Sequence, residues 1–323
     1  MERRTPVDQL WFLVKEGTET ERKLQVAGAV FGGMLSAYRN HQKLGEDGRK
    51  KDRVNQFGDQ ALRADIEAEE QVLESLKLWA QEANIKLNYR GEEVGKDTVG
   101  IEGGEPYLAL IDGLDGSDNY KNKTDWPYGT MVAIAKGEDP NYEDFEVAGV
   151  ALHEEGLLIL AIKHLGVWVY DTERQTSMPL PRFDNDEEYD EEKILADDYF
   201  PEAQELLGEK RGVWPRTGST AATISALVMD SIIKDDRYPM MNEGWQALVD
   251  VTRKGNLEQP VMYLMINELG GFMVDRDGKS IGGSNFDTWR QNEKVTVITA
   301  RSGKIIEEIR EQLGLSNRVK STP

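Results

Sequence analysis

Two aspartates stand directly after an apolar run of the chain. Residues 107–111 have the character of a buried strand, and Asp112 and Asp115 follow them three residues apart. Two carboxylates buried so close together are costly unless a cation lies between them. A pair of Mg²⁺ ions would meet that need, because Mg²⁺ prefers oxygen ligands. Asp112 would then bridge the ions, and the carbonyl of Leu114 would be free to act as a ligand.

The Gly-Ser pair that follows these aspartates could bind an anion. Gly116 lets the backbone approach a ligand closely, and a helix beginning at Ser117 would present its first amides to phosphate oxygens. The alternative is a tight Asx turn that caps a helix, since Asp, Gly and Ser are ordinary turn formers. Both interpretations stay open on this segment alone.

Two further acidic segments precede Asp112 in the chain. Glu92 belongs to a Gly-Glu-Glu sequence whose spacing could bring it to the same cluster, although such a sequence is usually an exposed turn. Asp65 lies where a helix is predicted to begin, and the ordinary role of an aspartate there is the N-cap.

Taken in order, these three segments resemble the inositol monophosphatase family of magnesium-dependent, lithium-sensitive sugar phosphatases. The family's signature is an Asp that opens a helix, a Gly-Glu-Glu, and an Asp-Pro-x-Asp-Gly-Thr/Ser, matched here by Asp65, residues 91–93 and residues 112–117. Residues 216–221 and 268–271 resemble two later stretches of the family. The superfamily also includes fructose-1,6-bisphosphatases and phosphatases that act on 3′-phosphoadenosine 5′-phosphate.

The resemblance implies a role for each matching residue. The metal ligands would be oxygen atoms of five residues: Glu92, Asp112, Leu114, Asp115 and Glu258. The attacking water would be activated by Asp65 and Ser117, with Glu92 as a further catalytic residue. The phosphate and the rest of the substrate would be bound by Gly116, Ser117, Arg216, Gly218 and Ser219. Two or three Mg²⁺ ions are implied, with Mn²⁺ as a possible substitute.

The chain departs from the family pattern at several positions. Gly113 replaces the usual proline, which is expected to loosen the turn between the two aspartates. Glu258 replaces an aspartate and is one methylene longer, and Leu62 stands where a threonine is usual. The stretch between residues 218 and 258 is longer than in the family. It is expected to shape the substrate pocket with four large or basic residues: Arg237, Trp245, Arg253 and Lys254.

The composition narrows the classes of function. The 323 residues include 39 basic and 59 acidic ones, a formal net charge of −20, which argues against nucleic acid as a partner. A phosphate substrate would also be repelled unless divalent cations neutralise the acidic cluster. The chain has no cysteine and only three histidines, so a thiolate nucleophile is excluded and a zinc site or a His-based triad is improbable.

The elements that must position these residues indicate an α+β fold. Helices are predicted at 20–38 and 64–83, with a mobile loop at 45–55. An antiparallel meander is predicted from five strands: 107–111, 129–135, 146–152, 156–162 and 166–170. After an acidic segment at 183–192 come strands at 193–196, 271–274 and 295–299 and helices at 202–207, 220–229, 260–268 and 304–313. The resemblance implies a layered α-β-α-β-α sandwich with halves at 1–182 and 193–323.

The expected function is hydrolysis of a small phosphate monoester, inositol monophosphate or a related sugar phosphate, without a covalent enzyme intermediate. Fructose-1,6-bisphosphatase activity and 3′-phosphoadenosine 5′-phosphate phosphatase activity are the alternatives. The alternative from another class of function is an inactive relative that binds a phosphorylated metabolite or a partner protein. The apolar stretch at 26–38 is too short to span a membrane, and a cytoplasmic location is expected. A homodimer is implied by the resemblance alone.

Overall fold

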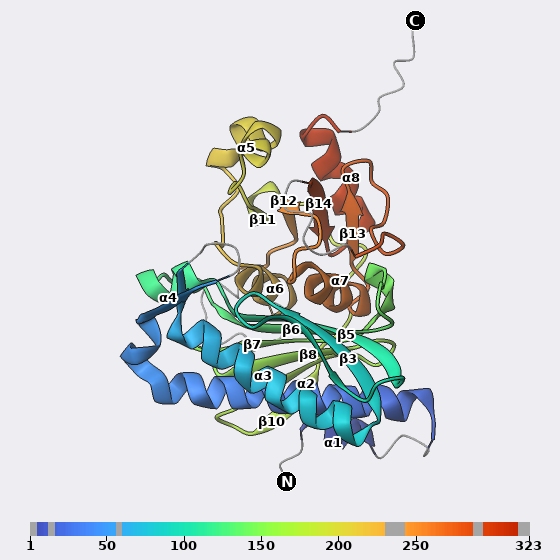
Figure 1. The fold of residues 1–323 in the computed structure, drawn as a ribbon. Helices are drawn as coiled ribbons and strands as arrows, with labels where there is room; N and C mark the ends of the chain where they lie inside the picture. The colour runs from blue at the N-terminus through green and yellow to red at the C-terminus, as the bar shows by residue number, and fades with distance from the viewer. Residues whose placement is uncertain (1–4, 12–16, 56–59, 230–242, 287–292, 316–323) are drawn as a thin grey trace, which may run out of the picture.

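Five layers make up the structure, a computed structural model that describes residues 5–11, 17–55, 60–229, 243–286 and 293–315. Figure 1 shows them in order: a helix pair, a large sheet, a second helix pair, a small sheet and the outer helices. This arrangement confirms the predicted α+β class and the α-β-α-β-α layering. None of the helices in the described ranges is long and apolar enough to cross a bilayer.

The first helix layer consists of α2 (Glu19–Leu44) and α3 (Arg63–Glu82), preceded by the short α1 (Pro6–Trp11). Both long helices were predicted, but α2 continues six residues beyond the predicted end at 38, because its buried stripe extends to His41. The two helices touch closely at Gly33, where an added Cβ would lie 3.0 Å from the Cα of Val72. Their apolar faces cover one side of the large sheet.

The large sheet has eight strands in the order β10-β9-β8-β7-β6-β5-β3-β4. Their bounds are β3 (Ile85–Gly91), β4 (Gly95–Gly100), β5 (Glu105–Asp115), β6 (Gly129–Lys136), β7 (Phe145–Leu152), β8 (Leu157–Ile162), β9 (Gly166–Asp171) and β10 (Thr176–Pro179). The antiparallel meander from β5 to β9 is confirmed. Sequence analysis missed β3, which pairs in parallel with β5 and buries only alternate residues.

The second helix layer and the small sheet come from the later part of the chain. Helices α6 (Thr220–Met229) and α7 (Gln259–Glu268) lie between the sheets, where the largest apolar cluster forms. The small sheet has the order β11-β12-β14-β13 and consists of β11 (Ile194–Ala196), β12 (Ala247–Arg253), β13 (Phe272–Asp275) and β14 (Lys294–Ala300). Helices α5 (Pro201–Leu207) and α8 (Gly303–Gln312) lie outside it. The division into two halves stays a prediction.

The remaining elements are short. They are the 3₁₀ turns η1 (Gly45–Arg49), η2 (Tyr142–Asp144), η3 (Glu191–Lys193) and η4 (Gly208–Gly212), the helix α4 (Ser117–Asn122), and the hairpin strands β1 (Lys51–Val54) and β2 (Gln60–Leu62). The segment at 45–55, predicted as a mobile loop, contains the turn η1 and the strand β1. The turn η1 is fixed by Tyr120, whose hydroxyl donates to the carbonyl of Gly45 at 3.0 Å.

Candidate metal and phosphate site

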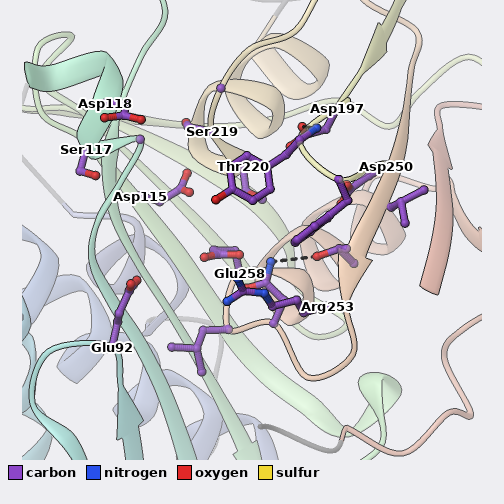
Figure 2. Close-up of a pocket in the computed structure, with 18 of the residues that line it drawn as sticks. Glu92, Asp115, Ser117, Asp118, Asp197, Ser219, Thr220, Asp250, Arg253 and Glu258 are labelled. Atoms are coloured by element: carbon purple, nitrogen blue, oxygen red, sulfur yellow. Dashed lines mark hydrogen bonds between the residues drawn. The ribbon is translucent and has the colours of Figure 1, made fainter. Parts of the chain in front are cut away.

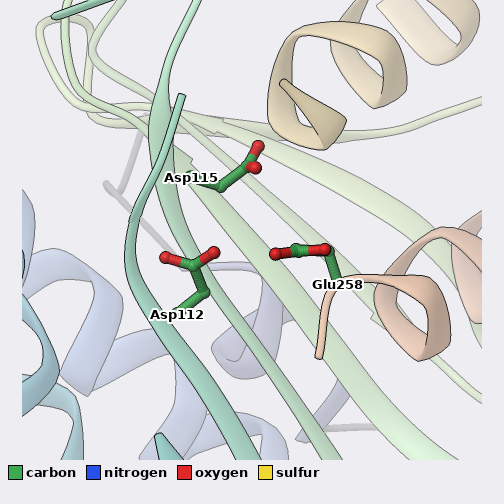
Figure 3. A group of neighbouring side chains, drawn as sticks. All are labelled: Asp112, Asp115 and Glu258. Atoms are coloured by element: carbon green, nitrogen blue, oxygen red, sulfur yellow. The ribbon is translucent and has the colours of Figure 1, made fainter. Parts of the chain in front are cut away.

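Three of the predicted carboxylate ligands converge on one point. Asp112, Asp115 and Glu258 each offer an oxygen atom, and these atoms all lie within 4.8 Å of one another (Figure 3). The two aspartates stand at the end of β5, while Glu258 immediately precedes α7. The first residues of the middle helix layer thus complete a site that begins on the large sheet.

A β-bulge turns both aspartates toward Glu258. Asp112 pairs with Met131 and Asp115 pairs with Gly129, so three steps along β5 match two steps along β6. In a regular strand, residues three apart point to opposite faces of the sheet. The extra residue cancels that alternation, and both carboxylates lie on the same side. This geometry could not be inferred from the spacing of the two aspartates.

Gly113, inside the bulge, has no room for a side chain. A Cβ added there would lie 2.1 Å from the carbonyl oxygen of Asp65 and 2.9 Å from Cγ of Glu69, both on α3. The lack of a side chain at Gly113 lets α3 press against the bulge, so the turn that was expected to be loose is closely packed. The N–H of Leu114 donates to Oδ1 of Asp112 at 3.0 Å and holds that carboxylate in place.

Among the residues that the structure describes, the three carboxylates have no basic side chain as a counter-charge. Burial, followed by the charges of Glu92 and Glu258, raises the pKa of Asp112 well above its usual range. Burial and the charge of Asp115 raise the pKa of Glu258 to about 8. Within the described ranges, no lysine or arginine forms an ion pair with any of the three. An oxygen-only donor set with this deficit of positive charge fits a hard divalent cation such as Mg²⁺.

Without a metal ion, the protein is expected to become less stable between about pH 5 and about pH 8. Because the folded chain raises the pKa of Asp112 and Glu258, both bind a proton more tightly when folded. The contribution of Glu258 is fully present below its unfolded pKa of about 4 and is lost as the pH rises through about 8, and the contribution of Asp112 is lost in the same direction. A loss of about 3 kcal/mol corresponds to a fall of roughly 5 °C in the melting temperature.

Thermal melts in EDTA and in saturating Mg²⁺ test this expectation. Mg²⁺ should raise the melting temperature more at the higher pH, because it binds the ionised carboxylates. A melting temperature in EDTA that climbs toward about pH 8, or a Mg²⁺ effect confined to acid pH, would contradict it.

Glu92 lies beside this group of three and is not part of it. Its backbone N–H donates to Oε1 of Glu69 at 2.8 Å, and the N–H of Val94 donates to Oε2 at 2.7 Å. Its own Oε1 accepts from Nδ2 of Asn55 at 3.2 Å. Sequence analysis missed Glu69, a fully buried carboxylate. It accepts hydrogen bonds from the backbone of the turn after β3 and so fixes the position of Glu92. Its position one helical turn after Asp65 was the available signal.

Asp65 does not line the larger pocket described below. It lines a small cavity of about 70 Å³ together with Glu92, Asp112 and Ser117, enough space for ordered water. Its Oδ2 accepts from the N–H of Leu62 at 2.8 Å, and it occupies the third position of α3, so the N-cap role considered for it is wrong. Burial raises the pKa of Asp65 to about 8, reinforced by the charges of Glu93 and Glu92.

A pocket of about 350 Å³ opens from the carboxylates toward the small sheet (Figure 2). It is lined by all the predicted phosphate- and substrate-binding residues: Gly116, Ser117, Arg216, Gly218 and Ser219. Helix α4 does begin at Ser117, as predicted, after Gly116 in the left-handed region at φ 83°. A Cβ on Gly116 would lie 2.7 Å from Cβ of Ser219, so the two loops touch.

Asp115 joins the group of three carboxylates to α6. It accepts a short hydrogen bond from the N–H of Ala221, while Oγ of Ser219 accepts from the N–H of Ala222 at 2.9 Å. Burial raises the pKa of Asp115 to about 6, and the hydrogen bonds from Ala221 and Ser219 oppose that rise. The first turn of α6 is therefore fixed to the end of β5.

No family model matches the sequence, and no curated protein matches it either. Solved structures match over nearly the whole chain. Fructose-1,6-bisphosphatase from Leishmania major is 14% identical, covers 97% of this chain and 100% of its own, and has a TM-score of 0.68. The extragenic suppressor protein SuhB from Bartonella henselae is 16% identical over 90% and 98%, with a TM-score of 0.61. The chain has the fold of these proteins.

A third similar structure supports the same conclusion about the fold. A Pyrococcus horikoshii protein described as similar to inositol-1 monophosphatase is 19% identical, covers 91% of this chain and 98% of its own, and has a TM-score of 0.56. The fold named from the sequence resemblance is thus confirmed by structures with low sequence identity.

Within this fold, the residues between 218 and 258 only partly match the expectation for the pocket. Arg253 and Lys254 line it, as predicted. Trp245 does not, because it packs in the core against Trp126 with ring centroids 6.3 Å apart. Arg237 lies outside the described residues. Arg216 reaches the pocket, but its guanidinium is engaged by Asp197, 3.3 Å from Nε to Oδ1.

Three acidic pocket residues were missed by sequence analysis: Asp118, Asp197 and Asp250. Asp197 follows β11, and Asp250 lies within β12 and accepts from Nε2 of Gln259 at 3.0 Å. Burial raises the pKa of Asp250 to about 8, and the charge of Asp197 adds to the rise. The signal for Asp250 was a single acid inside an apolar run, which marks a strand residue that faces a site.

Proposed function

We propose that this protein is a Mg²⁺-dependent phosphatase that hydrolyses a small phosphate monoester, inositol monophosphate or a related sugar phosphate. The observation that carries the proposal is the group formed by Asp112, Asp115 and Glu258, which has no counter-charge within the described ranges and of which Asp115 and Glu258 line the pocket. The pocket volume of about 350 Å³ suits a phosphorylated sugar or cyclitol. The low-identity structural matches, which include named phosphatases, support the proposal.

In the proposed mechanism, Asp112, Asp115, Glu258 and the Leu114 carbonyl would hold the metal ions, with Glu92 as a further ligand. Bound Mg²⁺ supplies Lewis-acid stabilisation of the phosphoryl group and lowers the pKa of a coordinated water. Asp65, with its pKa raised to about 8, accepts the proton of the attacking water, and the Ser117 hydroxyl orients that water.

In this proposal, the backbone at the start of α4 binds the phosphoryl group. The amides of Gly116 and Ser117 donate to phosphoryl oxygens, where negative charge must be balanced during transfer. Arg253 and Lys254 line the same pocket and favour an anionic substrate despite the acidic surface of the protein. They also favour a second candidate, a bisphosphate substrate such as fructose 1,6-bisphosphate, because a second anionic group would find a cationic partner there.

Phosphate release from a panel of substrates tests the proposal. The panel contains inositol monophosphate, fructose 1,6-bisphosphate and 3′-phosphoadenosine 5′-phosphate, each with EDTA, Mg²⁺, Mn²⁺ and Mg²⁺ plus Li⁺. We expect turnover only with Mg²⁺ or Mn²⁺ and inhibition by Li⁺. Metal binding without turnover of any substrate would favour the inactive, metabolite-binding alternative. The homodimer and the cytoplasmic location stay predictions.

A further inference from the structure

A chain of buried polar groups supports the bulge in addition to its contact with α3. Thr130 is the residue of β6 between Gly129 and Met131, the two partners of the bulge, and it is fully buried. Its hydroxyl donates to the carbonyl of Gly113 at 2.8 Å. A bulge disrupts the regular ladder between two strands, so a side-chain donor at this point replaces part of the lost backbone pairing.

The same hydroxyl is bound by a buried histidine. Nε2 of His153, which follows β7, lies 2.8 Å from Oγ1 of Thr130. A threonine hydroxyl has one hydrogen, and it is directed to Gly113, whose carbonyl can only accept. Oγ1 must therefore accept a hydrogen bond from His153, which fixes the tautomer of His153 with its hydrogen on Nε2. The result is a directed chain from His153 through Thr130 to Gly113.

The histidine itself is held rigidly. Its backbone carbonyl accepts from Nε2 of Gln42 at 2.7 Å, and its ring stacks on His41 with centroids 4.2 Å apart and planes 16° apart. Burial, followed by the charge of His41, lowers the pKa of His153 well below its usual value, so the ring is neutral. No described residue serves as a hydrogen-bond partner of its Nδ1. The hydrogen bond of the His153 ring therefore goes to Thr130, and the bond from Gln42 to its backbone carbonyl holds the residue in place.

We infer that Thr130 and His153 are positioning residues of the metal site. The inference rests on the proposed function. Gly113 lies between Asp112 and the Leu114 carbonyl in sequence, and its position is set by two contacts, one with α3 and one with the hydroxyl of Thr130. The hydroxyl of Thr130 thus fixes the bulge that gives Asp112 and Asp115 a common side, and His153 keeps that hydroxyl directed at Gly113.

Mn²⁺ binding tests the role of Thr130 without an activity assay. The affinity is measured by calorimetry and by electron paramagnetic resonance. Thr130→Val keeps the shape of the side chain and removes the hydroxyl, and it should weaken Mn²⁺ binding about tenfold. Thr130→Ser retains the hydroxyl and should bind within about threefold of the wild type. Thr299→Val is the matched control, because Thr299 is equally buried but lies on β14, away from the bulge.

The role of His153 is tested by comparing its variants in the presence and in the absence of the Thr130 hydroxyl. His153→Gln retains an N–H donor near the place of Nε2 and should restore most of the affinity that His153→Leu loses. In the Thr130→Val background, His153→Leu should cause no further loss, because its effect passes through the missing hydroxyl. Equal Mn²⁺ affinity of Thr130→Val, Thr299→Val and the wild type would overturn the inference and leave the proposed function intact. A wild type that binds no Mn²⁺ would overturn the proposed function as well.

Discussion

Replacing Asp115 by asparagine is expected to reduce Mg²⁺-dependent phosphate release by roughly a thousandfold or more, the equivalent of several kcal/mol of charge stabilisation. Asp115 is one of the three acids that no described basic side chain neutralises, and its amide analogue provides no negative charge for a metal ion. The amide oxygen can still accept from the N–H of Ala221, so the link to α6 survives. The repulsion with Glu258 disappears, so the metal-free protein should be at least as stable at about pH 8.

Loss of phosphate release together with unchanged stability of the metal-free variant would show that the substitution removes metal binding and does not unfold the protein. Phosphate release and the melting temperature in EDTA and in Mg²⁺ are measured for Asp115→Asn and for Asp186→Asn, a control in the exposed acidic segment at 183–192. The control should match the wild type in every respect. Full activity of Asp115→Asn, or a melting temperature that Mg²⁺ still raises as in the wild type, would contradict the proposed metal site.

Gly113→Ala is expected to destabilise the protein by at least about 3 kcal/mol, as overpacking against fixed backbone does. The added Cβ would lie 2.1 Å from the carbonyl oxygen of Asp65, and a backbone atom cannot move aside as a flexible side chain can. Gly113→Pro, which restores the residue usual in the family, should be no better, because proline also carries a Cβ. The departure from the family pattern at this position thus follows from how closely α3 approaches the bulge.

Chemical denaturation measures this effect directly. Gly212→Ala is the control, because a Cβ there meets no atom within 4 Å and its φ is not positive. The control should unfold at the wild-type denaturant concentration. The packing argument is wrong if Gly113→Ala and Gly212→Ala unfold at the same concentration. A stable Gly113→Pro variant with higher activity would instead support the earlier expectation of a loose turn.

The sequence predicted those features that local patterns determine. The apolar runs of β5 to β9 and the amphipathic spacing of α3 gave correct elements, and α7 and α8 were placed to within a residue or two. Glu258 was found through its position in the family pattern, although it replaces the usual aspartate. Its approach to Asp112 depends on long-range packing, which only the structure provides.

The features that sequence analysis missed depend on contacts between distant segments. The strands β3 and β12 contain polar residues that obscured their periodicity, and Asp250 is one of them. The bulge at Gly113 requires the close approach of α3, which no spacing within 112–117 can reveal. Glu69 looked like one more acid of an amphipathic helix, yet it is fully buried and binds the turn that carries Glu92.

The central claim is that Asp112, Asp115 and Glu258 share a divalent cation. A crystal grown in Mn²⁺, with anomalous diffraction recorded at the manganese edge, tests it most directly. We predict a strong anomalous peak within coordination distance of all three carboxylates, at about 2.2 Å from their nearest oxygens. A map with manganese bound elsewhere on the acidic surface, and none among these three side chains, would contradict the account.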